Sequence, residues 1–318
     1  MAGSRHADNV FAAVQSSSAA AVDPIAASWR RSLVHHGLDP EKVDGHRARL
    51  TDAELTEVLG YRELLLRIAQ PRIDALFSAV GGSGFCVALT DEDGVILARR
   101  SSASDEDHFD DVGLRRGCDW SEAAQGTNGI GTCLYEKRAV IVHRDEHFMS
   151  GYSGISCIDA PLFGADGELI GALDVSSGRS DHTGDMNRMI GLSVSQFAQQ
   201  IEADLFAAAY ADHRIMVTPN GTQGAVSLLA VDESDVVVGA TRAARTSYQL
   251  GLGADIAPIP VNDLLNRDGS CGGLDHSEKM AIKRALVRAN GNASEAAKAL
   301  KIGRATLYRR MQRLGIDR

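Results

Sequence analysis

Three short helical segments near the C-terminus, separated by residues that end and begin helices, constrain the fold of this chain more than any other feature. The segments cover residues 277–289, 294–300 and 304–314. The second is rich in alanine, and small side chains let a neighbouring helix cross closely. The pattern predicts an all-α module in which the last two helices form a helix-turn-helix.

The residues between these segments are typical of helix ends. Asn290 and Gly291 suit the left-handed position that follows a helix. Asn292 suits the N-cap of the second segment, and Glu295 is placed to complete a capping box. Lys301 opens the turn before the third segment, where a left-handed conformation would cost a lysine about 1 kcal/mol.

The third segment has one apolar and one basic face. Its apolar stripe consists of Leu307, Met311 and Leu314, and its opposite face carries Thr306, Arg309 and Arg313, with Arg310 at the margin. Apolar contacts on one side and guanidinium and hydroxyl groups on the other are typical of a helix that enters the major groove of DNA. The alternative is an ordinary three-helix cap whose arginines are only solvated.

Charge is unevenly distributed along the chain. Residues 276–318 contain 11 Lys and Arg and 3 Asp and Glu, a local charge of +8, although the whole chain carries −9. The remainder therefore carries −17. Because phosphate contacts act locally and salt screens charges over about 10 Å, the basic segment favours a DNA partner despite the acidic total.

The string GNASEAAKALKIGRATLYRRMQRLGI closely resembles the Fis-type helix-turn-helix of bacterial activators. The resemblance implies that Arg304, Thr306, Tyr308 and Arg309 occupy groove-facing and phosphate-contacting positions, with Ser294 near the DNA backbone. Together with Arg310 and Arg313 on the basic face, these residues form the predicted DNA-binding set. The family usually has glycine where this chain has Lys301, so we expect this turn to be less stable than it is with glycine.

The middle of the chain predicts an α+β fold. Residues 72–211 alternate short strands with helices, and Asp166-Gly167 between two apolar alternations is a strong hairpin signal. A long amphipathic helix over residues 184–210 closes this part, which we expect to be an antiparallel sheet with flanking helices. Before it lies a helical region, residues 1–71, in which Pro71 is expected to interrupt or restart the second helix.

Two further segments complete the predicted organisation. Residues 224–266 contain two short strands and a helix, which bury too little surface to form a stable independent domain. Residues 266–273 have the composition of a flexible linker to the helix-turn-helix domain, residues 275–318. We therefore expect four parts in the chain.

The part spanning residues 72–211 resembles a GAF domain of the kind found in regulators of acetoin and glycerol metabolism. The motifs that carry the resemblance are SWRRSLVHHGLDP at residues 28–40, Trp120 with GTNGIGT at 126–132, EHF at 146–148, and the pattern from Cys157 to LDVSS at 173–177. Residues 224–266 look like an abbreviated PAS domain.

The GAF resemblance implies a pocket for a small-molecule effector. The predicted ligand-binding residues are Trp120, Thr127, Asn128, Thr132, His143, His147, Cys157 and Asp159. A purely structural interpretation stays open, in which the glycines at 126, 129 and 131 permit a tight turn and Asn128 caps the following helix.

Neither a metal nor a cofactor is expected, and no catalytic residue is assigned. His143 and His147 with Cys157 lack a fourth ligand at diagnostic spacing. A redox alternative, in which a GAF domain reduces free methionine sulfoxide, would use two of Cys86, Cys118, Cys133 and Cys157. Such cysteines are more often small buried apolar residues, and an enzyme would leave the helix-turn-helix unexplained.

Relatives of this type place an ATPase between sensor and helix-turn-helix, but this sequence has no G-x-x-x-x-G-K-[ST] phosphate loop. We therefore expect a regulator that acts by occupying DNA, as a homodimer, with RNA polymerase or another regulator as a possible partner. A DNA binder with a GAF domain used only for dimerisation is the remaining alternative. Without a membrane span or signal peptide in this sequence, we expect a cytoplasmic location.

Overall fold

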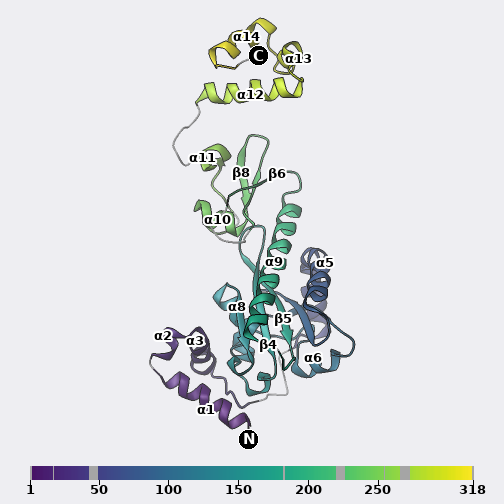
Figure 1. Ribbon diagram of the computed structural model, residues 1–318, viewed down its shortest axis with the longest axis vertical. Helices are drawn as coiled ribbons and strands as arrows, with labels where there is room; N and C mark the ends of the chain where they lie inside the picture. Colours follow the sequence, from purple (N-terminus) through teal and green to yellow (C-terminus); the bar gives the residue numbers. More distant parts are fainter. Residues whose placement is uncertain are drawn as a thin grey trace. The chain divides into compact units, whose positions relative to one another are not determined.

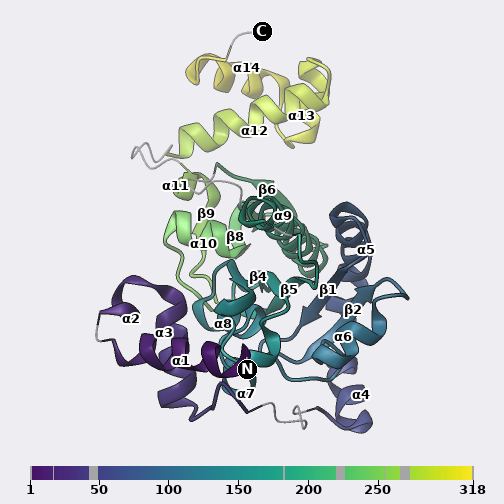
Figure 2. The same ribbon diagram turned by 60° about the horizontal axis from the view of Figure 1, so that its bottom comes forward.

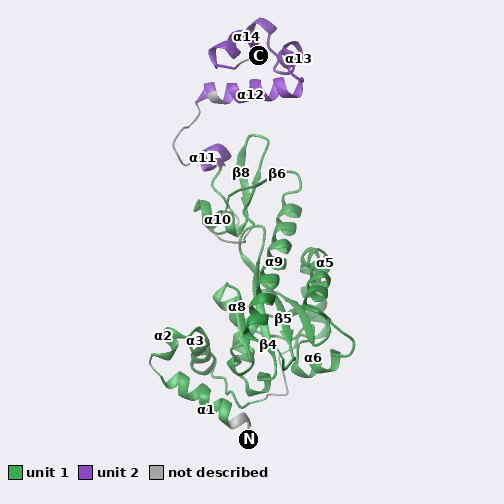
Figure 3. Cartoon of the chain, in the orientation of Figure 1, with its two compact units in different colours: residues 1–258 green, residues 259–318 purple. Residues whose placement is uncertain are grey.

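The computed structural model describes residues 2–16, 18–42, 49–181, 183–219, 226–253, 255–265 and 273–316. The chain divides into two compact units, residues 1–258 and 259–318 (Figure 3). The expected linker residues 266–272, and Cys271 within them, lie outside the described residues. None of the helices in the described ranges is long and apolar enough to cross a membrane.

Unit 1 contains two sheets and most of the helices. Its helices are α1 (Ala2–Gln15), α2 (Ala19–Val22), α3 (Pro24–Arg30), the π-helical turn η1 (Arg31–His35), α4 (Asp52–Tyr61), α5 (Glu63–Val80), α6 (Glu106–Val112), α7 (Glu122–Gln125), α8 (Gly129–Glu136), the 3-10 turns η2 (Arg144–Glu146) and η3 (Ser150–Tyr152), α9 (Gly184–Ala209) and α10 (Arg242–Tyr248). Its strands are β1 (Phe85–Thr90), β2 (Ile96–Ser101), β3 (Val140–His143), β4 (Ser156–Phe163), β5 (Leu169–Ser177), β6 (Arg214–Val217), β7 (Leu228–Val231) and β8 (Val236–Ala240).

The main sheet has the strand order β2-β1-β5-β4-β3, and its paired strands are antiparallel. Helices α5 and α9 pack on one face, and α8 with the loops around it packs on the other (Figure 1). The predicted antiparallel sheet with flanking helices is confirmed, as are the β4–β5 hairpin and the long helix α9. Apolar side chains therefore form separate cores above and below the sheet.

The helix break expected at Pro71 is wrong. Pro71 lies inside α5, which runs without interruption from Glu63 to Val80. The chain instead breaks between α4 and α5 at Arg62, two residues after Gly60. Buried contacts of α5 with the sheet and α9 on both sides of the proline outweigh the one hydrogen bond that proline removes.

The N-terminal helices dock on the loops around α8 (Figure 2). Ser28 of α3 is fully buried, and its Oγ lies 2.7 Å from Oγ1 of Thr127. The Arg31 guanidinium binds the Glu122 carboxylate through two bonds of 2.8 and 3.0 Å. Residues from the SWRRS motif therefore tie the start of the chain to the loop before α8.

A smaller sheet follows α9. Strands β6, β7 and β8 pair antiparallel in that order, and β6 was not predicted. Phe206 at the end of α9 packs with Leu228 and Ala230 of β7. This apolar contact joins the segment to the long helix.

Unit 2 contains β9 (Ile259–Pro260), α11 (Val261–Leu265), α12 (Leu274–Arg288), α13 (Ala293–Ala299) and α14 (Arg304–Arg313). The three predicted C-terminal helices are confirmed. Asn292 caps α13 by accepting from the backbone N–H groups of Ser294 and Glu295. Asn290, Gly291 and Lys301 all have positive φ, so both turns use the left-handed conformation. Ala296, Ala297, Leu307 and Met311 fill the core between the helices.

The left-handed turn between α13 and α14 gives a stability prediction. Lys301 has φ +52°, which costs about 1 kcal/mol relative to glycine. Lys301→Gly should slow amide hydrogen exchange in α13 of the full-length chain about fivefold. The control, Lys298→Gly inside α13, should speed exchange, because glycine weakens a helix interior. Faster exchange in Lys301→Gly would contradict the prediction.

Candidate functional site

Helix α14 presents two exposed arginines that have no carboxylate partner among the described residues. Arg304 is the first residue of the helix and Arg309 lies further along it. The Arg304 guanidinium is 5.6 Å from the ring centre of Tyr308, and its Nη2 donates to the Tyr308 hydroxyl at 3.4 Å. This contact holds Arg304 over the first turn of α14 without neutralising its charge.

Two other predicted DNA-binding arginines are held by α12. Arg310 pairs with Glu278 at 2.7 Å, and Arg313 pairs with both Glu278 and Asp275. These side chains are 43% and 56% exposed, so the pairs are worth little individually. They nevertheless direct both guanidinium groups toward α12, which separates them from Arg304 and Arg309.

The remaining predicted DNA-contacting residues lie on α13 and α14. Ser294 is exposed in the first turn of α13, and Thr306 is half-buried in the first turn of α14. Tyr308 is half-buried against the core of unit 2 and also lines a hollow of about 470 Å³ between α12 and α14. Ser294 and Thr306 therefore lie in the first turns of their helices, and Tyr308 lies further along α14.

In unit 1, the predicted ligand cluster is largely buried and hydrogen-bonded. Asn128 is the N-cap of α8 and accepts from the Gly131 N–H at 2.8 Å, while its amide donates to the Trp120 and Gly126 carbonyls. Trp120 itself is buried and donates to the Gly113 carbonyl. The Asn128 side chain therefore caps α8, as the purely structural interpretation expects.

His147 and Cys157 form a buried pair. His147 Nδ1 lies 2.9 Å from the Arg144 carbonyl, so Nδ1 carries the proton and donates it. Nε2 is then the acceptor, 3.3 Å from the Cys157 Sγ. Burial lowers the pKa of His147 to about 4 and raises the pKa of Cys157 well above its usual value. Both groups are neutral at pH 7.

The other predicted histidine lies at the end of β3. His143 Nδ1 is 2.7 Å from the Ser156 hydroxyl and 3.1 Å from the Asn187 amide nitrogen. It does not converge with His147 and Cys157 on a common point, and no group of three potential metal ligands occurs in the described parts of the chain. The histidines thus act in separate hydrogen-bond networks.

The cysteines of unit 1 are free and buried. Burial raises the pKa of the thiols of Cys86, Cys133 and Cys157. A nucleophilic cysteine needs the opposite shift, because the thiolate is the reactive form. The described residues offer no support for the reductase alternative.

Asp159 and Asp174 face each other across β4 and β5, fully buried. No group among the described residues donates a hydrogen bond to either oxygen of Asp159, whereas Asp174 accepts from the Ser176 hydroxyl at 2.9 Å. Burial and the neighbouring carboxylate raise the pKa of Asp159 well above its usual value, and burial raises that of Asp174 to about 7. Asp159 is therefore the protonated partner, and its proton is shared with Asp174.

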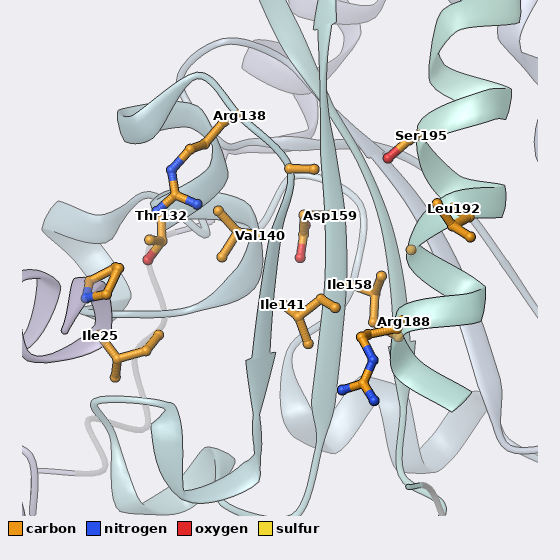
Figure 4. A pocket seen from close by; sticks show the side chains of 13 residues that line it. Ile25, Thr132, Arg138, Val140, Ile141, Ile158, Asp159, Arg188, Leu192 and Ser195 are labelled. Atoms are coloured by element: carbon orange, nitrogen blue, oxygen red, sulfur yellow. The ribbon is translucent and has the colours of Figure 1, made fainter. Parts of the chain in front are cut away.

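A pocket of about 610 Å³ opens where α3, α8, β3, β4 and α9 meet (Figure 4). Of the predicted ligand-binding residues, only Thr132 and Asp159 line it. The other six predicted residues lie outside its lining: Thr127, Asn128, Trp120, His143, His147 and Cys157. Sequence reasoning missed the other walls, which include Ile25, Arg138, Ile141, Arg188 and Leu192.

These features define a class of protein: a GAF-like domain in the same chain as a helix-turn-helix. The family model described as "MimR, N-terminal domain" matches residues 4–187, and the chain belongs to this family. The model described as "Bacterial regulatory protein, Fis family" matches residues 274–314. The first match includes α1–α3, in agreement with their docking on the loops around α8.

Relatives of the chain are named as transcription regulators. It is 32% identical over 230 residues to the "Acetoin catabolism regulatory protein" of Cupriavidus necator, covering 71% of this chain and 34% of that protein. It is also 32% identical over 136 residues to the "Propane 2-monooxygenase operon transcriptional activator MimR" of Mycolicibacterium smegmatis, covering 42% of this chain and 22% of that protein. The chain thus spans about a third or less of the length of these relatives.

A solved structure shares the fold. The crystal structure of the Escherichia coli DhaR(N)–DhaL complex contains a chain that aligns with a TM-score of 0.52 at 15% identity, covering 73% of this chain and 78% of that chain. At this identity the likeness shows the fold alone. It supports the GAF-like architecture of unit 1.

The buried acids predict how the stability of unit 1 depends on pH. A raised carboxyl pKa means that the folded state binds more protons than the unfolded state, so stability falls as pH rises toward the folded pKa. Burial raises the pKa of Glu202 on α9 to about 8. Glu202 and Asp174 both act this way. His147 has the opposite effect, but only between about 4 and its ordinary pKa near 6.5.

We therefore expect the free energy of unfolding to decrease from pH 6.5 to pH 8. Glu202→Gln keeps the acceptor for the Phe163 N–H and should remove about 1–2 kcal/mol of that decrease. Urea unfolding followed by tryptophan fluorescence reports on unit 1, which contains both tryptophans, Trp29 and Trp120. Glu168→Gln, at an exposed position, is the control. Equal pH slopes in wild type and Glu202→Gln would refute the assignment.

Proposed function

We propose that the chain is a sequence-specific DNA-binding transcription regulator. The observation that carries the proposal is the basic face of α14, where Arg304 and Arg309 are exposed and unneutralised among the described residues. Arginines of this kind bind phosphates and guanine edges in the major groove. The Fis-family match and the relatives named as regulators support the same function.

Within this proposal the DNA contacts divide into two groups. Arg304, Arg309, Thr306 and Tyr308 are the primary contacts, with Ser294 at the DNA backbone. Arg310 and Arg313 are secondary, because DNA must compete with Glu278 for their charge. A DNA phosphate has to displace these carboxylates before its contact with either arginine adds to the binding free energy.

The regulator acts by occupying DNA and contacting RNA polymerase or another regulator, not by hydrolysing ATP. Residues 210–273 separate α9 from α12, and the sequence has no phosphate-loop motif. A nucleotide site of the P-loop kind needs that motif to hold the phosphates. The GAF-like domain supplies the response to a small molecule. The pocket beside α9 is in a position to transmit that response.

The chain functions as a homodimer in this proposal. A single helix-turn-helix reads one half-site, and a palindrome needs two related by symmetry. Helix α9 offers an apolar surface for a second copy, since Met186 is 41% and Met189 71% exposed. Exposed apolar side chains in neighbouring turns of one helix are typical of an interface.

Two substitutions on α14 test DNA binding. Arg304→Ala and Arg309→Ala should each weaken binding to an operator fragment about tenfold or more, because each removes a charge-assisted contact worth about 1–3 kcal/mol. Each loss should also reduce the dependence of log affinity on log salt by about 1 when the contact is to phosphate. Titrations by fluorescence anisotropy at several salt concentrations measure both quantities.

Arg313→Ala is the matched control, because it removes an arginine of the same helix that is paired with α12. Its effect on affinity should be several-fold smaller than that of Arg309→Ala. If all three variants bind operator DNA as tightly as wild type, α14 is not the DNA-reading helix.

Dimerisation through α9 has its own test. Met189→Glu places a charge in the exposed apolar surface of α9 and should shift the chain toward monomer in light scattering at micromolar concentration. Gln196→Glu adds the same charge at an exposed position of the same helix and should leave the mass unchanged. A wild-type chain that stays monomeric with DNA bound would rule the dimer out.

A further inference from the structure

The pocket of unit 1 has mainly apolar walls with a few polar side chains among them. Ile25 of α3, Val140 and Ile141 of β3, Ile158 of β4 and Leu192 of α9 supply aliphatic surface from elements far apart in the sequence. Its volume of about 610 Å³ falls within the range of small-molecule sites, about 300–1,000 Å³. A ligand that fills this space must have an apolar body.

One buried polar group lines this pocket with unused hydrogen-bonding capacity. Asp159 is 1% exposed and lines the pocket, yet no group in the described chain donates to either of its oxygens. Burial raises the pKa of Asp159, so the group is neutral, and its proton is shared with Asp174. One oxygen is then left as an acceptor, and a ligand hydroxyl is the neutral donor that would satisfy it.

Two arginines add positive charge to the lining. Arg138 follows α8, and Arg188 lies on α9 (Figure 4). Among the described residues, each pairs only with a neighbour on its own segment, Arg138 with Glu136 at 3.7 Å and Arg188 with Asp185, and both side chains are more than half exposed. Such pairs are weak. A ligand anion can therefore engage either guanidinium without breaking a buried ion pair.

We propose that this pocket binds an organic acid with an apolar body and a hydroxyl group. The carboxylate binds Arg138 or Arg188, the body lies against the aliphatic walls, and the hydroxyl donates to Asp159. A cationic ligand is disfavoured by the two arginines. The inference rests on the proposed role of the GAF-like domain as an effector sensor, and it names the class of effector.

The site also provides a route from ligand to structure. Ile25 belongs to the N-terminal helices, whereas Arg188 and Leu192 belong to α9, which continues to the β6–β8 sheet. A ligand that fills the pocket therefore contacts both the N-terminal helices and α9.

Four probes with one ring system separate the parts of the proposal. In calorimetric titrations of the full chain, para-hydroxyphenylacetate should bind saturably. Phenylacetate, which lacks the hydroxyl, should bind about tenfold more weakly. Tyrosol, which replaces the carboxylate by an alcohol, should also bind about tenfold more weakly, and the cation tyramine should not bind.

Variants assign each contact. Arg138→Gln combined with Arg188→Gln should remove the advantage of para-hydroxyphenylacetate over tyrosol. Asp159→Leu should remove its advantage over phenylacetate, whereas Asp159→Asn, which keeps a neutral acceptor, should preserve it. Circular dichroism checks the fold of each variant.

A pocket-filling substitution keeps the proposal testable if Asp159 variants do not fold. A Cβ on Gly191 would meet Ile158 at 3.5 Å, an ordinary contact, so α9 accepts a side chain there. Gly191→Leu should abolish binding, and the control Gly191→Ala should retain it.

Failure to bind para-hydroxyphenylacetate, equal binding of all four probes, or binding that survives in Gly191→Leu would each overturn the inference. The DNA affinity of the same wild-type preparation is measured in parallel. Intact operator binding without probe binding refutes the ligand proposal alone, whereas absent operator binding refutes the proposed function.

Discussion

The close approach of α8 to β4 determines the arrangement of unit 1. A Cβ on Gly129 would lie 1.9 Å from Oδ2 of Asp159, and one on Gly131 would lie 2.4 Å from the backbone nitrogen of Glu122. Only hydrogen atoms fit in these spaces, so α8 rests directly on the sheet and on the loop before it. This contact fixes Asn128 at the start of α8 and brings Thr127 within reach of Ser28 on α3. The docking of the N-terminal helices therefore depends on two glycines about a hundred residues away.

The same contact explains why two carboxyl groups are buried side by side. With α8 lying on the sheet, Asp159 is 1% and Asp174 0% exposed, and two adjacent carboxylates would repel each other in a medium of low dielectric constant. Retaining one proton between them removes that repulsion. Burying two carboxyl groups costs desolvation free energy that apolar side chains would not, so the pair does not favour folding by itself, in keeping with the ligand-binding role proposed for Asp159. This is consistent with the position of Asp159 in the lining of the pocket.

Prediction from sequence succeeded where short-range interactions decide the structure. The ends of α13 follow from Asn292 and the left-handed residues on either side, because caps and turns involve residues a few positions apart. The β4–β5 hairpin follows from its Asp-Gly turn for the same reason. Pro71 shows the limit of such reasoning, since the local cost of a proline in α5 is offset by packing against α9, more than a hundred residues later.

The candidate pocket could not be located from sequence, because its walls come from five elements between α3 and α9. Thr132 and Asp159 could be selected by residue type, but nothing local distinguishes them from Trp120 or His147, which are buried and bonded elsewhere. Asn128 illustrates the ambiguity: the same amide could contact a ligand or cap a helix. The Asn128 bonds to Gly131, Gly126 and Trp120 use its oxygen and both amide hydrogens.

The charge distribution limits how such a chain could recognise DNA. The −17 carried outside residues 276–318 repels phosphate, and the +8 within them attracts it. Because salt screens these fields over about 10 Å, the acidic part lowers affinity only where it comes close to the duplex. Within the helix-turn-helix, Glu278 and Asp275 already neutralise much of the charge of Arg310 and Arg313. Of the arginines on α14, the proposed DNA contacts then fall mainly to Arg304 and Arg309, and a second copy of the module on the same site would raise the affinity through multivalency.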